Sequence, residues 1–169
     1  EFVLAAIDPF GNCTNGIEHI YTHETSTGER QMHKVGQWDR SHYFNIWVTK
    51  EPGAASQGIL LGYGTFPSMV DGSTFWQDGI VLRSTTVGAN DRTLTHEVGH
   101  NLALQHSFGG TGTAGDGICE DDNVADTPIT DGSFSTCDTS LRFCDINILE
   151  NVQNHMDYSS CNRNFTQGQ

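Results

Sequence analysis

The sequence predicts an α+β fold with two unequal lobes, and three observations support this prediction. Candidate strands occupy the chain before residue 91, one amphipathic helix follows them, and the remainder is rich in Gly, Asp and Thr. Strands followed by helices in this order are typical of α+β domains. Because 169 residues can bury one core, we expect a single domain over residues 1–169, divided into subdomains at 1–106 and 107–169.

Three stretches before the helix have the features of strands. Residues 43–48 alternate large apolar side chains with mixed ones, as a half-buried strand does. Residues 58–66 and 79–84 are short apolar runs that begin at glycine. Residues 2–7 are also expected to form a strand, and residues 11–16 a turn.

The clearest helix is expected over residues 91–105, where Asn90 or Asp91 can cap the first turn. A second, short helix is expected over residues 146–153. In the first helix, the apolar side chains at helical spacing should face the core; they are Leu94, Val98 and Leu102.

The charge and hydropathy of the sequence limit the kinds of molecule that the protein can bind. The chain has 21 acidic and 8 basic residues, a formal net charge of −13, so it should repel nucleic acid and anionic lipid. It could attract basic peptides or bind cations. No apolar run approaches the roughly 18–20 residues that span a membrane, and no signal peptide opens the sequence. We therefore expect any targeting segment to lie outside this stretch.

Four of the five cysteines lie in the last third of the chain, where regular structure is sparse. No C-x-x-C pair is present, so a thiolate zinc site is not expected. Two disulfides that stabilise a loop-rich region fit better, and they indicate an oxidising compartment and hence secretion. Cys13 is left over.

The helix over residues 91–105 contains the motif H-E-x-x-H. His96 and His100 are four residues apart, so both imidazoles lie on one helical face and can reach one zinc ion. Glu97 lies beside them and can take a proton from a water whose pKa the metal has lowered. A third ligand must come from outside the motif. We expect it to be His106, whereas a gluzincin-type peptidase would use a downstream glutamate such as Glu120 or Glu150.

With His106 included, the pattern resembles the extended metzincin motif H-E-x-x-H-x-x-G-x-x-H. Ala103 stands where metzincins have the glycine that turns the chain toward the metal. An alanine in the left-handed conformation costs roughly 1 kcal/mol, which a zinc site worth on the order of 10 kcal/mol can absorb. Further on, Met156 resembles the methionine beneath the metal of metzincins, and Tyr158 the tyrosine that stabilises the oxyanion in several of their families.

More specifically, the chain resembles the pappalysin family of metzincins. The resemblance rests on four blocks in family order, at residues 4–17, 61–67 and 96–108, and at 124–128 together with 154–165. It implies a twisted, mostly parallel sheet with an antiparallel edge strand, an active-site helix and a smaller loop-rich C-terminal subdomain. It also implies that the second block is the edge strand, and that its residues Gly62, Tyr63 and Gly64 bind substrate as an added strand.

The family further implies disulfides Cys119–Cys144 and Cys137–Cys161, and one or two structural calcium ions. The stretch from Asp116 to Asp131 is acidic without Lys or Arg, so cations would relieve its self-repulsion. The candidate calcium ligands are Asp116, Asp121, Asp122, Val124 through its carbonyl, Asp126 and Thr127.

Two departures from the family are visible. Members that cleave before Arg or Lys have an additional acidic residue between the methionine turn and the last cysteine, and it is missing from residues 157–160 here. Family members also usually continue into a further helix beyond the position of Gln169, so the C-terminal subdomain looks truncated.

Taken together, these features predict a secreted, monomeric zinc endopeptidase that acts on protein or peptide substrates, with one catalytic zinc and Glu97 as general base. The alternatives are a calcium-stabilised binding module with a vestigial metal site and a gluzincin-type peptidase.

Overall fold

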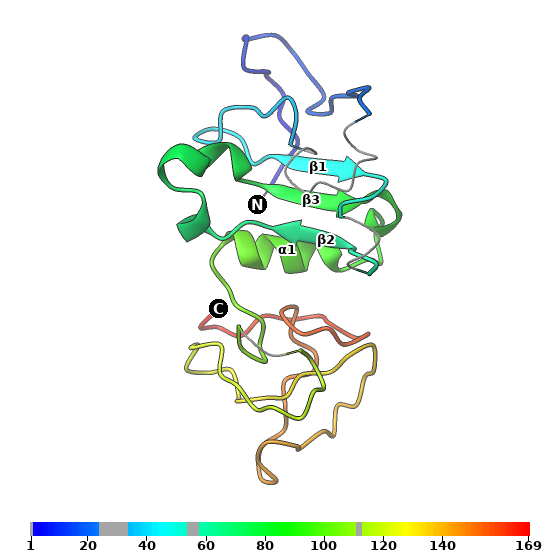
Figure 1. The fold of residues 1–169 in the computed structure, drawn as a ribbon, viewed down its shortest axis with the longest axis vertical. Helices are drawn as coiled ribbons and strands as arrows, with labels where there is room; N and C mark the ends of the chain where they lie inside the picture. The colour runs from blue at the N-terminus through cyan, green and yellow to red at the C-terminus, as the bar shows by residue number, and fades with distance from the viewer. Residues whose placement is uncertain (1, 24–33, 54–57, 111–112) are drawn as a thin grey trace. The chain divides into compact units, whose positions relative to one another are not determined.

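The computed structural model describes residues 2–23, 34–53, 58–110 and 113–169 of the chain. The chain divides into two compact units, Glu1–Glu97 and Val98–Gln169, which are described separately. The named strands lie in the first unit, and helix α1 contains the division between the two (Figure 1).

The first unit contains a mixed three-stranded sheet. Its strands are β1 (Ile46–Thr49), β2 (Gly62–Gly64) and β3 (Ile80–Arg83), in the spatial order β1-β3-β2. β1 pairs with β3 in parallel and β2 pairs with β3 antiparallel, with Tyr63 opposite Val81. Each of the three internal stretches predicted as strands overlaps one of these strands, and the antiparallel edge strand is confirmed.

β3 is central because its side chains are apolar on both faces. Ile80 and Val81 are fully buried and Leu82 is 2% exposed, the pattern of a strand covered on both sides. β2 packs closely against it at Gly62, where an added Cβ would lie 3.0 Å from the Leu82 side chain and 3.1 Å from Thr93. The missing side chain therefore lets the edge strand lie close to β3 and to the start of α1.

Helix α1 (Thr93–Asn101) is shorter than the predicted 91–105. Oδ1 of Asp91 accepts the backbone N–H of Thr93 at 2.8 Å, which supports the first turn. At the other end Ala103 has φ 75°, and the N–H groups of Ala103 and Leu104 donate to the carbonyls of His100 and Gly99, both at 2.9 Å. This pair of bonds is a Schellman motif, and it ends the helix four residues early.

The prediction that the apolar stripe of this helix faces the core was wrong. Leu94 is 38% exposed and Leu102 is 62% exposed. The buried face instead carries His96, Glu97 and His100, which are 9%, 6% and 8% exposed. Polar side chains therefore occupy the face that an ordinary amphipathic helix fills with apolar ones.

Two further predicted elements are absent from the described residues. Residues 2–7 form no strand, and only Ile7 makes an isolated bridge, to Cys13, because the segment has no neighbouring strand with which to pair. Residues 146–153 form turns instead of a helix. There, Oδ1 of Asp145 accepts the N–H of Asn147 at 2.8 Å, and a side chain that bonds the nearby backbone in this way favours a turn.

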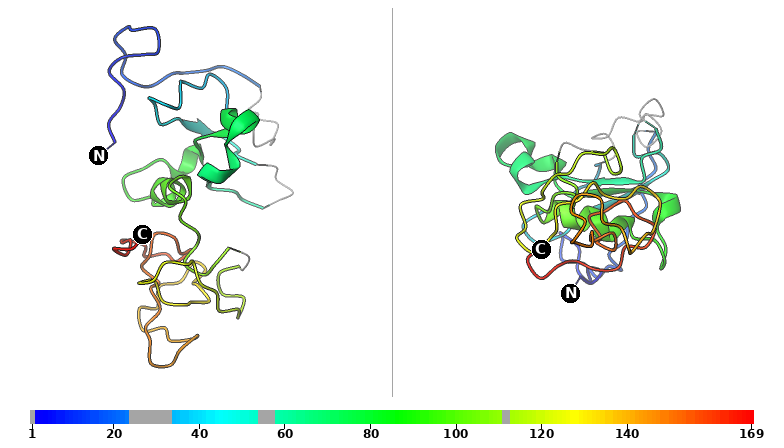
Figure 2. Two further views of the ribbon diagram at one scale, coloured as in Figure 1. Left: turned by 90° about the vertical axis from the view of Figure 1, so that its left-hand side faces the viewer. Right: turned by 90° about the horizontal axis from the view of Figure 1, so that it is seen from below.

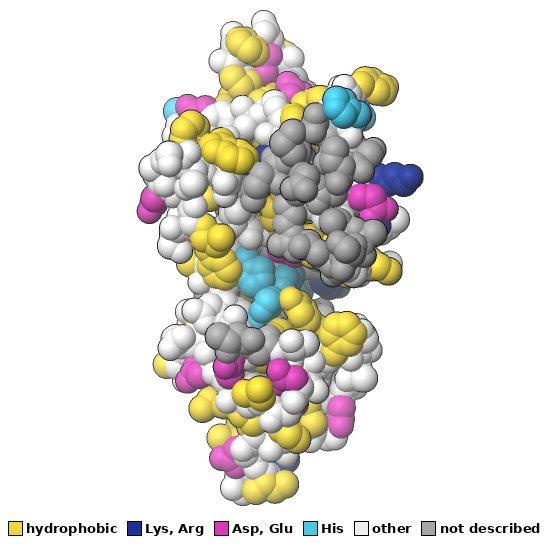
Figure 3. All heavy atoms as spheres, in the orientation of Figure 1, with side chains coloured by type: hydrophobic (Ala, Val, Ile, Leu, Met, Phe, Trp, Pro, Cys, Tyr) yellow, Lys and Arg dark blue, Asp and Glu magenta, His cyan; other side chains and the backbone are white. Residues whose placement is uncertain are grey.

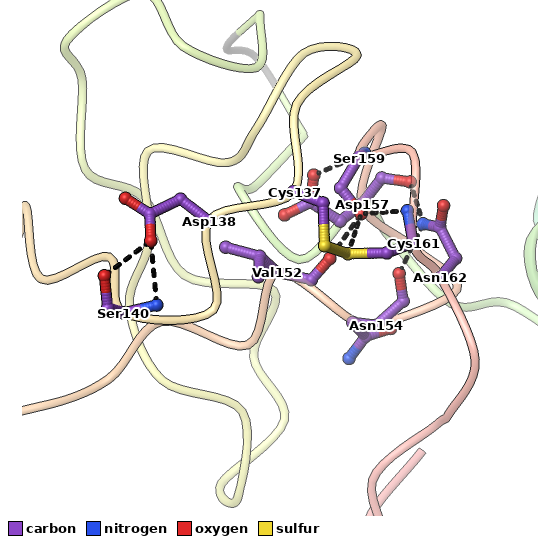
Figure 4. The surroundings of a disulfide bond; sticks show 9 residues. All are labelled: Cys137, Asp138, Ser140, Val152, Asn154, Asp157, Ser159, Cys161 and Asn162. Carbon is purple, nitrogen blue, oxygen red and sulfur yellow. Dashed lines mark hydrogen bonds between the residues drawn. A yellow bond between two sulfur atoms is a disulfide. The ribbon is translucent and has the colours of Figure 1, made fainter.

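The second unit continues from the end of α1 as turns, bends and isolated bridges over its described residues (Figures 1 and 2). A small core of Phe108, Val152 and Met156 is 0–1% exposed. Two disulfides supplement that core, Cys119–Cys144 and Cys137–Cys161, the pairing that the family resemblance implies. Figure 4 shows the second of them. Cys13, in the first unit, is an exposed free thiol.

Within the described ranges, no helix is both long enough and apolar enough to cross a bilayer.

Candidate active site

Helix α1 presents two histidines and a glutamate from adjacent positions. His96 and His100 are one turn apart on the same face, and Glu97 follows His96 directly. Histidine side chains form a visible group on the face drawn in Figure 3. The motif found in the sequence therefore lies on a helix, and its three polar side chains are largely buried.

The Schellman turn at Ala103 reverses the chain and brings a third imidazole back to the helix. Nε2 of His106 lies 3.1 Å from Nε2 of His100, and the ligand atoms of His96, His100 and His106 all lie within 4.8 Å of one another. Two nitrogens bound to one tetrahedral zinc at about 2.0–2.1 Å would be about 3.3 Å apart. Within the described parts of the chain, this is the only group of three or more His, Cys, Asp or Glu that is close enough to share an ion.

The chemistry of these donors also fits zinc. Nδ1 of His100 lies 2.8 Å from the carbonyl oxygen of Leu104, so a proton on Nδ1 is bonded and the lone pair of Nε2 is directed at the other imidazoles. Burial lowers the pKa of His100, which favours the neutral ring that a metal needs.

Glu97 is a buried carboxyl group beside the histidines. Burial raises its pKa to about 7, and the hydrogen bond that the backbone N–H of Gly64 donates to it opposes that rise. Gly64 is the last residue of the edge strand β2. The carboxyl group of Glu97 is therefore hydrogen-bonded to the strand that is predicted to bind substrate.

Aromatic rings surround His106. The Tyr158 hydroxyl lies 3.0 Å from Nε2 of His106, and its ring is 40% exposed. Phe108, which is 1% exposed, stacks on the imidazole with centroids 4.7 Å apart and planes 9° apart. Phe108 thereby restrains the plane of the imidazole, and Tyr158 places its hydroxyl next to Nε2 of His106.

Met156 lies directly beneath the helix. It is fully buried, and a Cβ added to Gly99 would lie 2.3 Å from its sulfur. Oδ1 of Asn154 accepts the N–H of Met156 at 2.9 Å, and the carbonyl of Met156 accepts the N–H of Ser107 at 3.1 Å. The methionine turn is thus bonded to the residue that follows His106.

The carboxylates proposed as alternative zinc ligands lie in other arrangements. Oε1 of Glu150 accepts the N–H groups of Phe143 and Cys144 at 2.9 and 3.0 Å, and Oε2 accepts the hydroxyl of Thr130. Glu120 forms a backbone bridge with Thr130, and its side chain lies against Gly109. Neither belongs to the histidine group.

The predicted calcium ligands do not form a comparable group of side chains. Asp116 and Asp126 each use both carboxylate oxygens as acceptors from the chain, including the Gly168 N–H at 2.9 Å from Asp126. Asp122 is the most buried of the acidic candidates, at 5% exposed, and burial raises its pKa. Asp121 accepts the N–H of Asn123 at 2.7 Å.

Sequence reasoning missed three residues that shape the site: Gly99, Phe108 and Leu104. Gly99 lies inside the zinc motif, and a glycine within a helix is a signal of close packing. Phe108 and the carbonyl of Leu104 act through tertiary contacts that no sequence spacing reports.

Comparisons with known proteins find similarity to metalloproteases. The family model Peptidase_M43, described as pregnancy-associated plasma protein-A, matches residues 26–169. Extracellular metalloprotease 1 of Coccidioides posadasii is 37% identical over 136 residues, which cover 74% of this chain and 46% of that protein. The extracellular metalloprotease of Sordaria macrospora is 36% identical over 137 residues, with coverages of 74% and 45%. The chain thus spans about half the length of these curated relatives.

Solved structures of mirolysin are also similar. Mature mirolysin of Tannerella forsythia, in complex with a cleaved peptide, has a TM-score of 0.75 and 31% identity, and the match covers 99% of this chain and 67% of that one. Mirolysin in complex with compound 9 has a TM-score of 0.79 and 32% identity, with coverages of 99% and 66%.

Proposed function

The chain belongs to the Peptidase_M43 family, the pappalysins, and on that basis we propose that it forms the catalytic part of a secreted zinc endopeptidase. The observation that carries the proposal is the convergence of three imidazoles beside a buried glutamate. Secretion is supported by two disulfides and by relatives that are named extracellular metalloproteases. We also propose that the chain acts as a monomer, which its sedimentation mass would test.

In this proposal His96, His100 and His106 hold the zinc. When bound, zinc polarises the scissile carbonyl and makes water more acidic. Glu97 takes the proton from the attacking water and delivers it to the leaving amine, a role that its position directly after His96 on the same helix allows. The Tyr158 hydroxyl donates a hydrogen bond to the oxyanion that develops in the transition state.

We further propose that peptide substrates add to β2 as an antiparallel strand through Gly62, Tyr63 and Gly64. β2 is the last strand in the sheet order of the described residues, and an edge strand is the element to which an extended peptide adds. Gly64 is also bonded to Glu97, which places the strand and the general base next to each other.

The proposal is tested by replacing the general base. Glu97→Ala should retain about one zinc per chain while casein cleavage falls at least about a hundredfold, because the proton acceptor is lost. Glu18→Ala, at an exposed glutamate, is the control and should cleave normally. Cleavage that survives Glu97→Ala would refute the mechanism, and a zinc-loaded wild type that hydrolyses no peptide would support a vestigial site instead.

The identity of the third ligand is tested separately. His106→Ala should weaken zinc binding strongly, whereas Glu120→Ala should leave zinc affinity unchanged, since Glu120 is outside the histidine group. The opposite result would indicate a gluzincin site.

Structural calcium is the remaining part of the proposal. We propose that one or two ions bind the loop over residues 116–127, with Asp122, the carbonyl of Val124 and Thr127 as central ligands. Support comes from the burial of Asp122 and Thr127, at 5% and 8% exposed, in a stretch without basic residues. Calcium should raise the melting temperature of the wild type but not that of Asp122→Asn. An identical response in both proteins would exclude this site.

A further inference from the structure

An exposed aromatic side chain lies next to Tyr158. Phe134 is 63% exposed, and its ring centroid is 6.4 Å from that of Tyr158 in an edge-to-face arrangement. Tyr158 is in turn hydrogen-bonded to His106. An exposed apolar side chain therefore lies one residue away from a predicted metal ligand.

The backbone that carries Phe134 is held firmly against the segment that carries Tyr158. The N–H of Ser135 donates to the carbonyl of Tyr158 at 3.0 Å, and the N–H of Ser160 donates to the carbonyl of Thr136 at 3.0 Å. The disulfide between Cys137 and Cys161 then closes the two segments together (Figure 4). Two aromatic rings on paired, cross-linked segments form a preorganised surface.

The acidic residue closest in sequence to this surface is turned inward. Asp157 is 2% exposed, and its Oδ1 accepts the N–H groups of Ser133 and Ser159 at 2.9 and 3.1 Å. Figure 4 shows it beside the disulfide. Its carboxylate is therefore buried and bonded to the backbone, so it cannot meet a basic substrate side chain at the exposed aromatic surface.

We propose that Phe134 and Tyr158 form an apolar wall that selects an aromatic or large aliphatic substrate residue at one of the two positions flanking the scissile bond. This inference rests on the proposed peptidase function and adds the substrate class to it. The overall charge of −13 attracts basic peptides at long range. Direct contact with Phe134 and Tyr158 instead favours apolar substrate side chains.

Cleavage profiling of a peptide mixture tests the wall. Wild type should cleave with Phe, Leu, Ile or Met enriched at one flanking position, and Phe134→Ala should lose about tenfold in kcat/KM for a phenylalanine peptide relative to its alanine analogue. Phe134→Asp should shift the preference toward Lys and Arg. The matched control is Phe143→Ala, at an aromatic residue of the same unit that is 56% exposed, and it should keep the wild-type profile.

Binding distinguishes failure of the wall from failure of the proposed function. In the Glu97→Ala background, fluorescence anisotropy should show the phenylalanine peptide binding about tenfold more tightly than the alanine peptide, and Phe134→Ala should remove the difference. If the wild type cleaves no peptide, the peptidase proposal is refuted. The difference in affinity between the phenylalanine and alanine peptides tests the apolar wall even in that case. A profile and a binding preference that Phe134→Ala leaves unchanged would overturn the inference.

Discussion

Nδ1 of His100 lies 2.8 Å from the carbonyl oxygen of Leu104, so the turn that ends α1 also orients an imidazole of the candidate zinc site. The carbonyl of Leu104 is available because the chain reverses at Ala103, whose φ is 75°. The same reversal carries the chain on to His106. Helix termination and assembly of the site therefore depend on one strained residue.

Relieving that strain should stabilise the protein. Glycine is the residue that favours a left-handed C-cap, so Ala103→Gly should raise the free energy of unfolding by up to about 1 kcal/mol. Urea unfolding of the metal-free protein measures the change. Ala125→Gly, at an exposed turn residue without positive φ, is the control and should be destabilising. A loss of stability in Ala103→Gly would show that the left-handed turn is wrong.

Close packing between Gly99 and Met156 gives a second prediction. In Gly99→Ala the new methyl group would meet the buried Met156 sulfur, and overpacking should cost about 1–3 kcal/mol, more than the roughly 1 kcal/mol gained in helix propensity. Gly88→Ala, where a Cβ meets nothing within 4 Å, should be tolerated.

A double-mutant cycle identifies the contact responsible. If Met156 is the obstacle, Gly99→Ala combined with Met156→Ala should destabilise by less than the sum of the single changes, because the truncated side chain leaves room. Additive effects would place the cost of Gly99→Ala elsewhere.

How far the site can be predicted from the sequence depends on whether its geometry is local. His96, Glu97 and His100 follow from the register of a single helix, and the reversal expected at Ala103 is present. A strand around residues 62–64 was predicted from a short local apolar run next to glycines, whereas its position at the edge of the sheet was implied by the family resemblance. These features need only the chain within a few residues.

Features that depend on distant partners could not be predicted in this way. Residues 2–7 look like a strand, but a strand requires a neighbour, which composition does not report. In the last third of the chain a short helix was predicted at 146–153. The carboxylate of Glu150 instead accepts the backbone N–H groups of Phe143 and Cys144 and holds the loop around the disulfide. The exposed side of Phe134 likewise depends on the pairing of two loops.

The disulfide Cys137–Cys161 should stabilise the second unit. It closes a loop with a sequence separation of 24, so replacing both cysteines by serine should lower the free energy of unfolding by about 3 kcal/mol. Cys13→Ser, at the exposed free thiol, should change stability by less than about 0.5 kcal/mol. Equal effects of the two replacements, measured in urea under non-reducing conditions, would mean that the cross-link contributes nothing.

The buried carboxyl group of Asp157 should make stability depend on pH. Burial raises its pKa from the ordinary value of 3.8 to about 6, so the fold favours the protonated form. Its contribution to stability is therefore fully present below pH 3.8 and is lost as the pH rises through about 6. Asp157→Asn does not titrate and keeps an acceptor for the N–H groups of Ser133 and Ser159.

Between about pH 4 and pH 6, the free energy of unfolding of Asp157→Asn should therefore rise relative to that of wild type, by at most roughly 3 kcal/mol. Above that range the difference between the two proteins should be constant. Unfolding in urea at a series of pH values measures it. Asp138→Asn provides a control of opposite sign, because hydrogen bonds from Ser140 lower the pKa of Asp138 and its contribution is lost as the pH falls. Parallel pH profiles for wild type and Asp157→Asn would show that the Asp157 carboxyl group is not held in a protonated, buried state, since only a pKa that changes on folding couples its proton to stability.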